Sequence, residues 1–172
     1  MVIWKVEESN LRLSISGVGE SGKDTAAAWF GEHTNLRYVG STSYCAADIV
    51  FKRFGNKYTS ILECYNDRRN CRDDWVKYID EINSIDKACL YKHCLNVQDI
   101  LTGVRRSEEL QAVKESCNID LFIWIDRPGF ADHTMMYDAS SCDITILNDG
   151  NLSQFYHKLK RLAKVLKIYD PS

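Results

Sequence analysis

The chain has 172 residues, of which 45% are hydrophobic and only two are proline, so it is long enough to bury a core and is expected to form one globular domain. Its net charge of −2 gives no global attraction to nucleic acid, so any such contact would need a local patch. Residues 1–10 show no signal-peptide pattern and no apolar run approaches the roughly 18 residues of a membrane span, which predicts a cytoplasmic protein without a membrane partner.

The first predicted elements are a strand, a glycine-rich loop and a helix. Residues 11–15 alternate apolar and polar side chains as a short strand does, and residues 24–30 form an alanine-rich run that favours a helix. Between them, "SGVGESGKDT" nearly matches the phosphate-binding pattern G-x-x-x-x-G-K-[ST], with Gly17, Gly22 and Lys23 in register. A strand before the loop and a helix after it are the context that this pattern requires.

The loop predicts an ATP site. Backbone N–H groups of the loop and the amino terminus of the helix would hold phosphates, and Lys23 would reach the terminal phosphates. Asp24 stands where a magnesium-binding hydroxyl is usual, so we expect Asp24 to hold Mg²⁺ through water or to act as a base, with Thr25 supplying a nearby hydroxyl. The predicted ATP-binding residues are Gly17, Gly19, Glu20, Ser21, Gly22, Lys23, Asp24 and Thr25. The alternative is a glycine-rich turn without a ligand.

The rest of the chain predicts alternating helices and strands. Further strands are expected at residues 36–40, 99–104, 120–125 and 143–147, and helices at 44–54, 69–83, 87–95, 107–115 and 152–166. This alternation predicts an α/β fold with a parallel sheet and helices on both faces. Ligands of such sheets bind at the carboxyl ends of the strands, which is where the glycine loop lies.

A charged segment precedes the middle of the chain. "YNDRRNCRDDW" carries Arg68 and Arg72 four residues apart and Trp75 one turn further, which would place them on one face of a helix. Arginine can bind phosphate through two hydrogen bonds and indole can stack on a base, so the three residues are predicted to bind an anionic, aromatic acceptor. The alternative is a solvated helix that Trp75 anchors in the core.

Two later strands are followed by arginine. "GVRRSEE" places Arg105, and "DRPGFADH" places Arg127, at the sheet edge that holds the glycine loop. Both are predicted to stabilise charge on a phosphoryl group during transfer, which makes Lys23, Asp24, Arg105 and Arg127 the candidate catalytic residues. The alternative for the two arginines is a surface ion pair with Glu108, Glu109 or Asp126.

These motifs together resemble a known family. "SGVGESGKDT", "ILTGVRRSEELQAV", "IWIDRPG" and "ITILNDGNLSQFYHKL" are similar, in the same order, to blocks of the bacteriophage P-loop deoxynucleoside monophosphate kinases, whose loop also reads G-K-D-T. The resemblance implies a single three-layer P-loop kinase domain over 1–172, with a helical acceptor-binding insertion near 44–95 and a short lid-like loop near 127–140. The implied localisation is the host cytoplasm if the chain is phage-encoded.

The resemblance also implies a reaction. It implies transfer of the γ-phosphoryl group of ATP, with Mg²⁺, to a deoxynucleotide-class acceptor, most simply a deoxynucleoside monophosphate. The same superfamily includes phage kinases that phosphorylate 5-hydroxymethyluracil in DNA, so DNA is an alternative acceptor. Gly103 stands where many relatives carry Asp, which increases the demand on Asp24 and leaves a catalytically inactive nucleotide-binding module as a second alternative. The sequence leaves the base preference and homodimer formation open.

Overall fold

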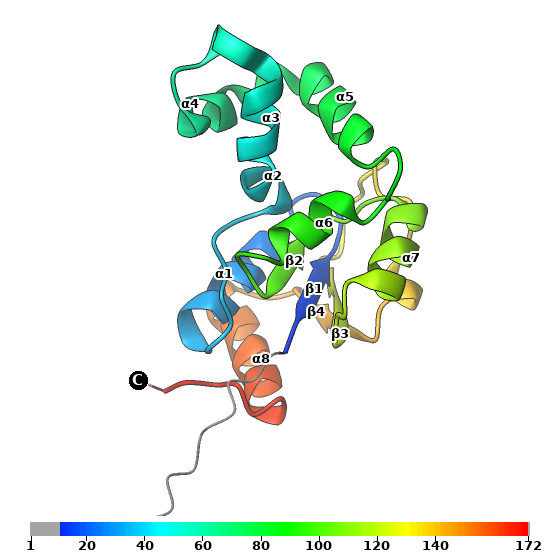
Figure 1. Cartoon of the computed structure of the whole chain (residues 1–172). Helices are drawn as coiled ribbons and strands as arrows, with labels where there is room; N and C mark the ends of the chain where they lie inside the picture. Colours follow the sequence, from blue (N-terminus) through cyan, green and yellow to red (C-terminus); the bar gives the residue numbers. More distant parts are fainter. Residues whose placement is uncertain (1–10, 172) are drawn as a thin grey trace, which may run out of the picture.

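The computed structural model describes residues 11–171 and contains a parallel sheet of four strands in the order β2-β1-β3-β4. The strands are β1 (Leu13–Ser16), β2 (Ile100–Thr102), β3 (Leu121–Asp126) and β4 (Ile144–Leu147). All three neighbouring pairs are parallel, so the carboxyl ends of the strands lie along one edge. In Figure 1 this edge points toward the helices of residues 42–82. The predicted α/β fold with a parallel sheet is confirmed.

Helices cover both faces of the sheet and form two cores. On one face, α1 (Lys23–His33) and α8 (Leu152–Val165) pack against side chains such as Ile15 and Ile123. On the other face, α6 (Cys89–Cys94) and α7 (Ser107–Ser116) pack against Leu101 and Phe122. Successive side chains of a strand point to opposite faces, so adjacent residues such as Ile100 and Leu101 enter different cores.

A group of helices lies between α1 and β2 and projects above the carboxyl edge of the sheet (Figure 1). The group contains α2 (Thr42–Cys45), α3 (Ala47–Phe54), the 3₁₀ turn η1 (Gly55–Lys57), α4 (Ile61–Asn66), the 3₁₀ turn η2 (Asp67–Arg69) and α5 (Arg72–Ile82). It shares a core with α6 and α7 through buried side chains that include Val50, Cys64 and Trp75. A last 3₁₀ turn, η3 (Ala139–Ser141), precedes β4.

Some expected elements differ in the structure. The strand expected at 36–40 is wrong: the segment lies beside the start of β2, but the side-chain oxygen of Gln98 accepts the N–H groups of Val39 and Gly40 in place of a strand ladder. The helix expected at 44–54 is two helices that meet at Ala46. The helix expected at 69–83 begins only at Arg72, and α4 was not expected.

The expectation about a signal peptide concerns residues 1–10, which lie outside the described residues. No candidate for a membrane-spanning helix occurs among residues 11–171.

Candidate functional site

The glycine loop connects β1 to α1 with backbone geometry that only glycine fits well. Gly17 has φ of +154°, and a Cβ atom on it would lie 2.5 Å from Ser21 Oγ and 2.6 Å from the carbonyl oxygen of Ile125. Gly22 has φ of 98° and stands at the N-cap of α1, where no side chain caps the helix. The first amide groups of α1 therefore have no side-chain acceptor, which is the arrangement that favours an anion at a helix amino terminus.

Lys23 and Asp24 open α1 beside this loop. Lys23 is 8% exposed, and its Nζ donates to the carbonyl oxygen of Val18 at 3.5 Å, so the ammonium group is folded over the loop. The carboxylate of Asp24 lies 3.9 Å from the same Nζ and its side chain is 62% exposed. Lys23 thus supplies a cation held against the loop, and Asp24 an acidic group open to solvent. Thr25 is exposed in the same turn.

Two side chains hold carbonyl groups of the loop from outside. Arg127, which follows β3, donates from Nη1 to the carbonyl oxygen of Glu20 at 3.0 Å and stacks over the ring of Phe130. Asn148, which follows β4, donates from Nδ2 to the carbonyl oxygen of Ser21 at 2.8 Å. Both residues lie just beyond carboxyl ends of strands, so the parallel sheet itself brings them to the loop.

Arg105 reaches the loop through an acidic partner. Its Nη1 donates to Asp132 Oδ2 at 2.7 Å, and the same oxygen accepts the N–H of Gly19 at 3.1 Å. Hydrogen bonds from Thr134 and from Arg105 hold the pKa of Asp132 well below its usual range. The structure therefore brings Lys23, Arg105 and Arg127 together around the loop, and the ion-pair partner of Arg105 is Asp132 instead of Glu108 or Glu109.

Gly103 has a local explanation. It follows β2 with φ of +91°, a conformation that a side chain disfavours, and the hydroxyl of Thr42 donates to the neighbouring carbonyl oxygen of Thr102. Because α2 is docked against the end of β2 in this way, Thr42 lies 3.7 Å from where a Cβ atom of residue 103 would be. An aspartate at this position would be strained in this backbone.

The predicted acceptor residues do not share one helix face. Arg68 lies in η2, Arg72 opens α5 at the surface, and Cys71 between them has non-helical dihedral angles. Trp75 is 4% exposed and belongs to the core under the helical group. The interpretation of Trp75 as a stacking surface is therefore corrected: the indole anchors α5, because its large apolar area is buried by packing.

Arg68 instead stacks on an aromatic pair of the helical group. Its guanidinium stacks 3.9 Å from the ring centre of Tyr65, and Tyr65 packs edge to face with Tyr44. Burial raises the pKa of Tyr38 to about 12, and the charges of Asp24 and Tyr65 act in the same direction. The pKa of Tyr38 therefore responds to charges on both α1 and α4. We call Tyr38, Tyr44, Tyr65 and Arg68 the tyrosine surface.

Several of these residues escaped the sequence prediction. Asp132 and Thr134 form the D-x-T pattern of a turn in which an Asp side chain caps the backbone two residues on, and that pattern is visible in "ADHT". Asn148 follows β4 as Arg127 follows β3, so the same strand-end argument could have found it. The tyrosine surface has no local pattern, because its members come from different segments that only the tertiary fold brings together.

The loop fits a triphosphate with Mg²⁺. It combines an uncapped helix amino terminus, a buried lysine and the buried hydroxyl of Ser21, for which the described residues supply no hydrogen-bond partner. Among residues 11–171, no group of three or more His, Cys, Asp or Glu side chains forms a metal cage. That is compatible with Mg²⁺, which is commonly held by one or two carboxylates together with substrate phosphates and waters. Asp24 and Thr25 are the residues that would hold it.

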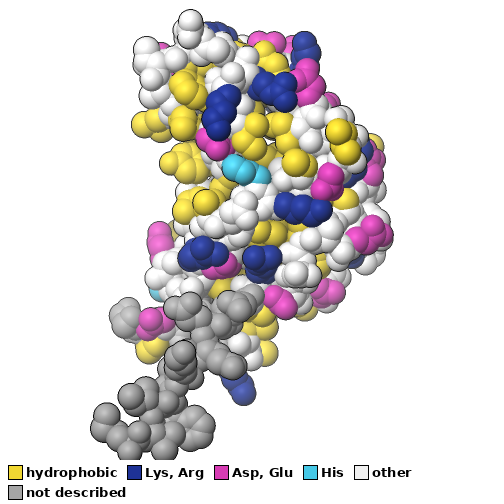
Figure 2. Space-filling view, in the orientation of Figure 1, with side chains coloured by type: hydrophobic (Ala, Val, Ile, Leu, Met, Phe, Trp, Pro, Cys, Tyr) yellow, Lys and Arg dark blue, Asp and Glu magenta, His cyan; other side chains and the backbone are white. Residues whose placement is uncertain are grey.

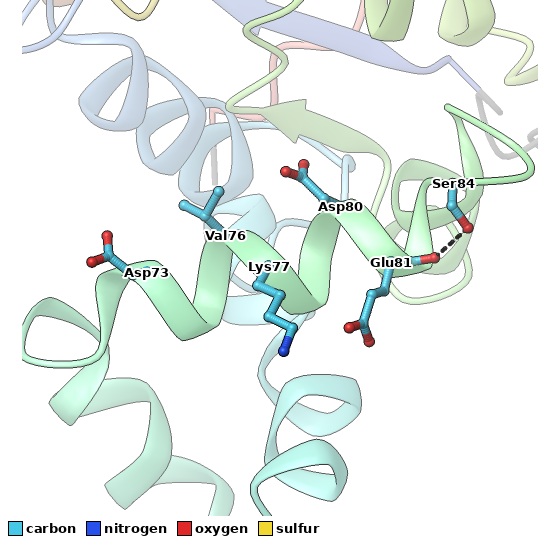
Figure 3. A pocket seen from close by; sticks show the side chains of 6 residues that line it. All are labelled: Asp73, Val76, Lys77, Asp80, Glu81 and Ser84. Carbon is cyan, nitrogen blue, oxygen red and sulfur yellow. Dashed lines mark hydrogen bonds between the residues drawn. The ribbon is translucent and has the colours of Figure 1, made fainter.

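One hollow of the surface lies away from the glycine loop. A shallow cleft of about 610 Å³ runs along α5, lined by Asp73, Val76, Lys77, Asp80, Glu81 and Ser84 (Figure 3). Asp80 is paired with Arg106 at 2.8 Å, next in sequence to Arg105. On the face shown in Figure 2, basic side chains are interspersed with acidic ones and form no continuous patch. This face therefore offers no extended track for a nucleic-acid backbone.

Comparison with known proteins finds similar chains among the solved structures. No protein-family model and no curated protein matches the chain. The chain is similar to an unliganded sugar kinase from Janibacter sp., with 15% identity, a TM-score of 0.47, and coverage of 92% of this chain and 95% of that one. At this identity and score the likeness indicates no substrate.

Proposed function

We propose that the protein is an ATP- and Mg²⁺-dependent phosphotransferase whose acceptor is of the deoxynucleotide class, with a free deoxynucleoside monophosphate as the leading candidate. One observation carries the proposal: Lys23, Arg105 and Arg127 come from three separate segments and meet at a glycine loop that opens an uncapped helix. Lys23 and Arg127 bind carbonyl groups of the loop and Arg105 reaches the Gly19 amide through Asp132, an arrangement that a turn without a ligand would not require.

Each loop residue has a part in the proposed mechanism. The amides around Gly17, Gly19 and Gly22 orient the donor phosphates, and Lys23 draws negative charge from the terminal groups. Bound Mg²⁺ would neutralise phosphate charge, held by Asp24 and Thr25 directly or through water. Arg127 binds the carbonyl oxygen of Glu20 and, with Arg105, is proposed to stabilise charge on the transferred phosphoryl group. Arg105 lies where it can reach a transferred phosphoryl group once Asp132 no longer holds it.

The acceptor is proposed to bind between the loop and the tyrosine surface. Asp24 is exposed, and its charge and that of Tyr65 both raise the pKa of Tyr38. Aromatic rings at this position suit a planar base, and the Arg68 guanidinium suits a phosphate. In this proposal the helices over residues 44–95 are the acceptor-binding insertion and residues 127–140 are the lid-like loop.

One observation favours a second acceptor, the hydroxymethyl group of 5-hydroxymethyluracil in DNA. An alcohol must lose a proton during transfer, and Asp24 presents an exposed carboxylate for this purpose. The face in Figure 2 has no continuous basic patch, so DNA bound on that face would lack an extended track for its phosphates.

The test is a transfer assay with radiolabelled ATP. Purified protein is incubated with each deoxynucleoside monophosphate, and separately with DNA that contains or lacks 5-hydroxymethyluracil. Label transferred to one monophosphate supports the leading proposal, and label in the modified DNA alone supports the second. ATP binding without transfer to any acceptor would identify a nucleotide-binding module, and absence of ATP binding would overturn the proposal.

A further inference from the structure

Asp132 makes two different kinds of contact with its two carboxylate oxygens. Oδ1 accepts hydrogen bonds from the backbone N–H of Thr134 at 2.9 Å and from its hydroxyl at 2.6 Å, which closes a turn within the loop after β3. Oδ2 accepts from the N–H of Gly19 at 3.1 Å and from Arg105 Nη1 at 2.7 Å. The side chain of Asp132 is only 14% exposed, so the carboxylate is inserted between the phosphate loop and Arg105.

A second aspartate in the same loop shows that the turn does not require this insertion. Asp138 accepts from the N–H of Ser140 at 2.9 Å and from its hydroxyl at 2.5 Å, both through Oδ1. Its turn is chemically the same as that of Asp132, yet the Asp138 side chain is exposed and caps η3 at the surface. The contacts of Asp132 Oδ2 are thus an addition to the turn.

The position of Asp132 Oδ2 is that of an anion on the phosphate loop. A phosphate loop binds its ligand through backbone N–H groups, and a carboxylate accepts the same hydrogen bonds as a phosphate oxygen. On the basis of the proposed function, we propose that Asp132 is an internal stand-in for a donor phosphate: it occupies the Gly19 amide in the unliganded protein and keeps Arg105 neutralised until a triphosphate displaces it.

Displacement follows from the hydrogen-bond inventory. The single N–H of Gly19 cannot make a full hydrogen bond to a phosphate oxygen while Asp132 accepts it, and two anions beside one amide repel each other. When Asp132 leaves, Arg105 loses its carboxylate partner and becomes available to the phosphate. The same event therefore admits the donor and releases a cation for it.

The movement can stay local because the far end of the loop is fixed. The N–H of Met136 donates to the carbonyl oxygen of Arg105 at 2.9 Å, and the hydroxyl of Ser107 donates to the carbonyl oxygen of Met136 at 2.6 Å. The hydroxyl of Tyr137 donates to the carbonyl oxygen of Val104 at 2.8 Å. The turn at residues 132–134 can therefore move away from Gly19 while these hydrogen bonds keep Met136 and Tyr137 in place.

The test is the substitution Asp132→Asn. Asparagine keeps an oxygen for the Thr134 turn, but its NH₂ group would face two donors, Gly19 N–H and Arg105, so the contact opens. For a ligand that must displace Asp132, the apparent affinity equals the intrinsic affinity multiplied by the fraction of protein in which the contact is open. We expect Asp132→Asn to lower the Kd for ATP, measured by calorimetry without Mg²⁺, by about three- to tenfold. Asp138→Asn is the matched control and should leave the Kd unchanged.

Inorganic tripolyphosphate serves as a second probe, because the contact competes with phosphate and not with a base. The same gain in affinity for tripolyphosphate supports the proposal. Unchanged or weaker binding of ATP by Asp132→Asn, with the wild-type protein binding ATP, overturns the stand-in and leaves the proposed function intact. If neither the wild-type protein nor the variants bind ATP or tripolyphosphate, both the stand-in and the proposed function are overturned.

Discussion

Gly17 lies directly against the carbonyl oxygen of Ile125: a Cβ atom on Gly17 would come within 2.6 Å of that oxygen, closer than real Cβ contacts. The glycine loop is therefore seated on the end of β3. We expect Gly17→Ala to lower the free energy of unfolding by about 1–3 kcal/mol, because the methyl group overpacks this contact. Nucleotide binding should be lost with it, since the loop must shift to admit the methyl group.

Gly55→Ala is the control for this prediction. Gly55 also has a positive φ of +59°, but a Cβ atom there would meet nothing within 4 Å. With ψ of −124°, Gly55 lies outside the left-handed helical region, so the substitution should cost only the backbone strain, about 1–3 kcal/mol, and leave nucleotide binding unchanged. Chemical denaturation and calorimetric titration with ATP measure the two effects. Normal ATP binding by Gly17→Ala would contradict the role given to this contact.

The second prediction concerns Lys23→Ala. Among residues 11–171, Lys23 makes one long hydrogen bond, at 3.5 Å, and a 3.9 Å ion pair with the exposed Asp24, so its removal should hardly change the melting temperature. Phosphoryl transfer should be abolished, because the transferred group loses a cation aimed at it. Lys164→Ala, at the exposed end of α8, is the control and should keep full activity. Turnover close to wild type in Lys23→Ala would refute the phosphate-loop assignment.

Asp24→Asn should reduce turnover far more than ATP affinity. The carboxylate is exposed at the first turn of α1. Because residue 103, after β2, is a glycine, that position supplies no second carboxylate to hold Mg²⁺. A general base or a metal-positioning carboxylate contributes about two to four decades in rate, so kcat should fall by about that much. The measurement is kcat beside the Kd for ATP. A raised Kd with unchanged kcat would assign Asp24 to donor binding only.

The parallel sheet and the strand–glycine loop–helix unit were predictable from sequence because their signals are local. Alternating elements predicted the sheet, and the rule for strand ends placed Arg105 and Arg127 beside the loop. Asp132 could also have been found, because the D-x-T pattern of residues 132–134 is enough to predict its turn. The residues of the tyrosine surface could not, because Tyr38, Tyr44 and Tyr65 stand in different segments and no local pattern links them. Trp75 was misread for a related reason: helical spacing places a side chain on a face but does not say which face is buried.

Trp75 is now expected to act on stability. Its indole is 4% exposed in the core of the helical group, and Trp75→Ala should lower the free energy of unfolding by about 3–5 kcal/mol. Among the described residues its Nε1 has no hydrogen-bond partner, so Trp75→Phe removes no such bond and should cost much less. Denaturation curves compare the two. Full stability of Trp75→Ala together with a raised acceptor KM would restore the stacking interpretation.

Arg68→Ala tests the acceptor side of the site and, at the same time, the kind of acceptor. Arg68 is stacked 3.9 Å from the ring centre of Tyr65 and donates to the carbonyl oxygen of Tyr65 at 3.0 Å, so its position is fixed before an acceptor binds. A charge-assisted hydrogen bond to a phosphate contributes roughly 1.5–3 kcal/mol, so the acceptor KM should rise about tenfold or more while the KM for ATP stays constant. Arg72 was expected to act with Arg68, and Arg72→Ala tests that expectation in the same assay.

Arg69→Ala is the control for Arg68, because Arg69 is the exposed neighbour in the same 3₁₀ turn. Salt dependence then separates the acceptors. Binding of DNA releases counterions from many phosphates, so the affinity for DNA should fall steeply as the salt concentration rises. Arg68→Ala should reduce the slope of log affinity against log salt concentration by about one, the share of a single phosphate contact. A monophosphate offers too few charges for a steep slope. An acceptor KM equal to wild type in Arg68→Ala would remove the tyrosine surface from the acceptor site, because Arg68 is its only cation.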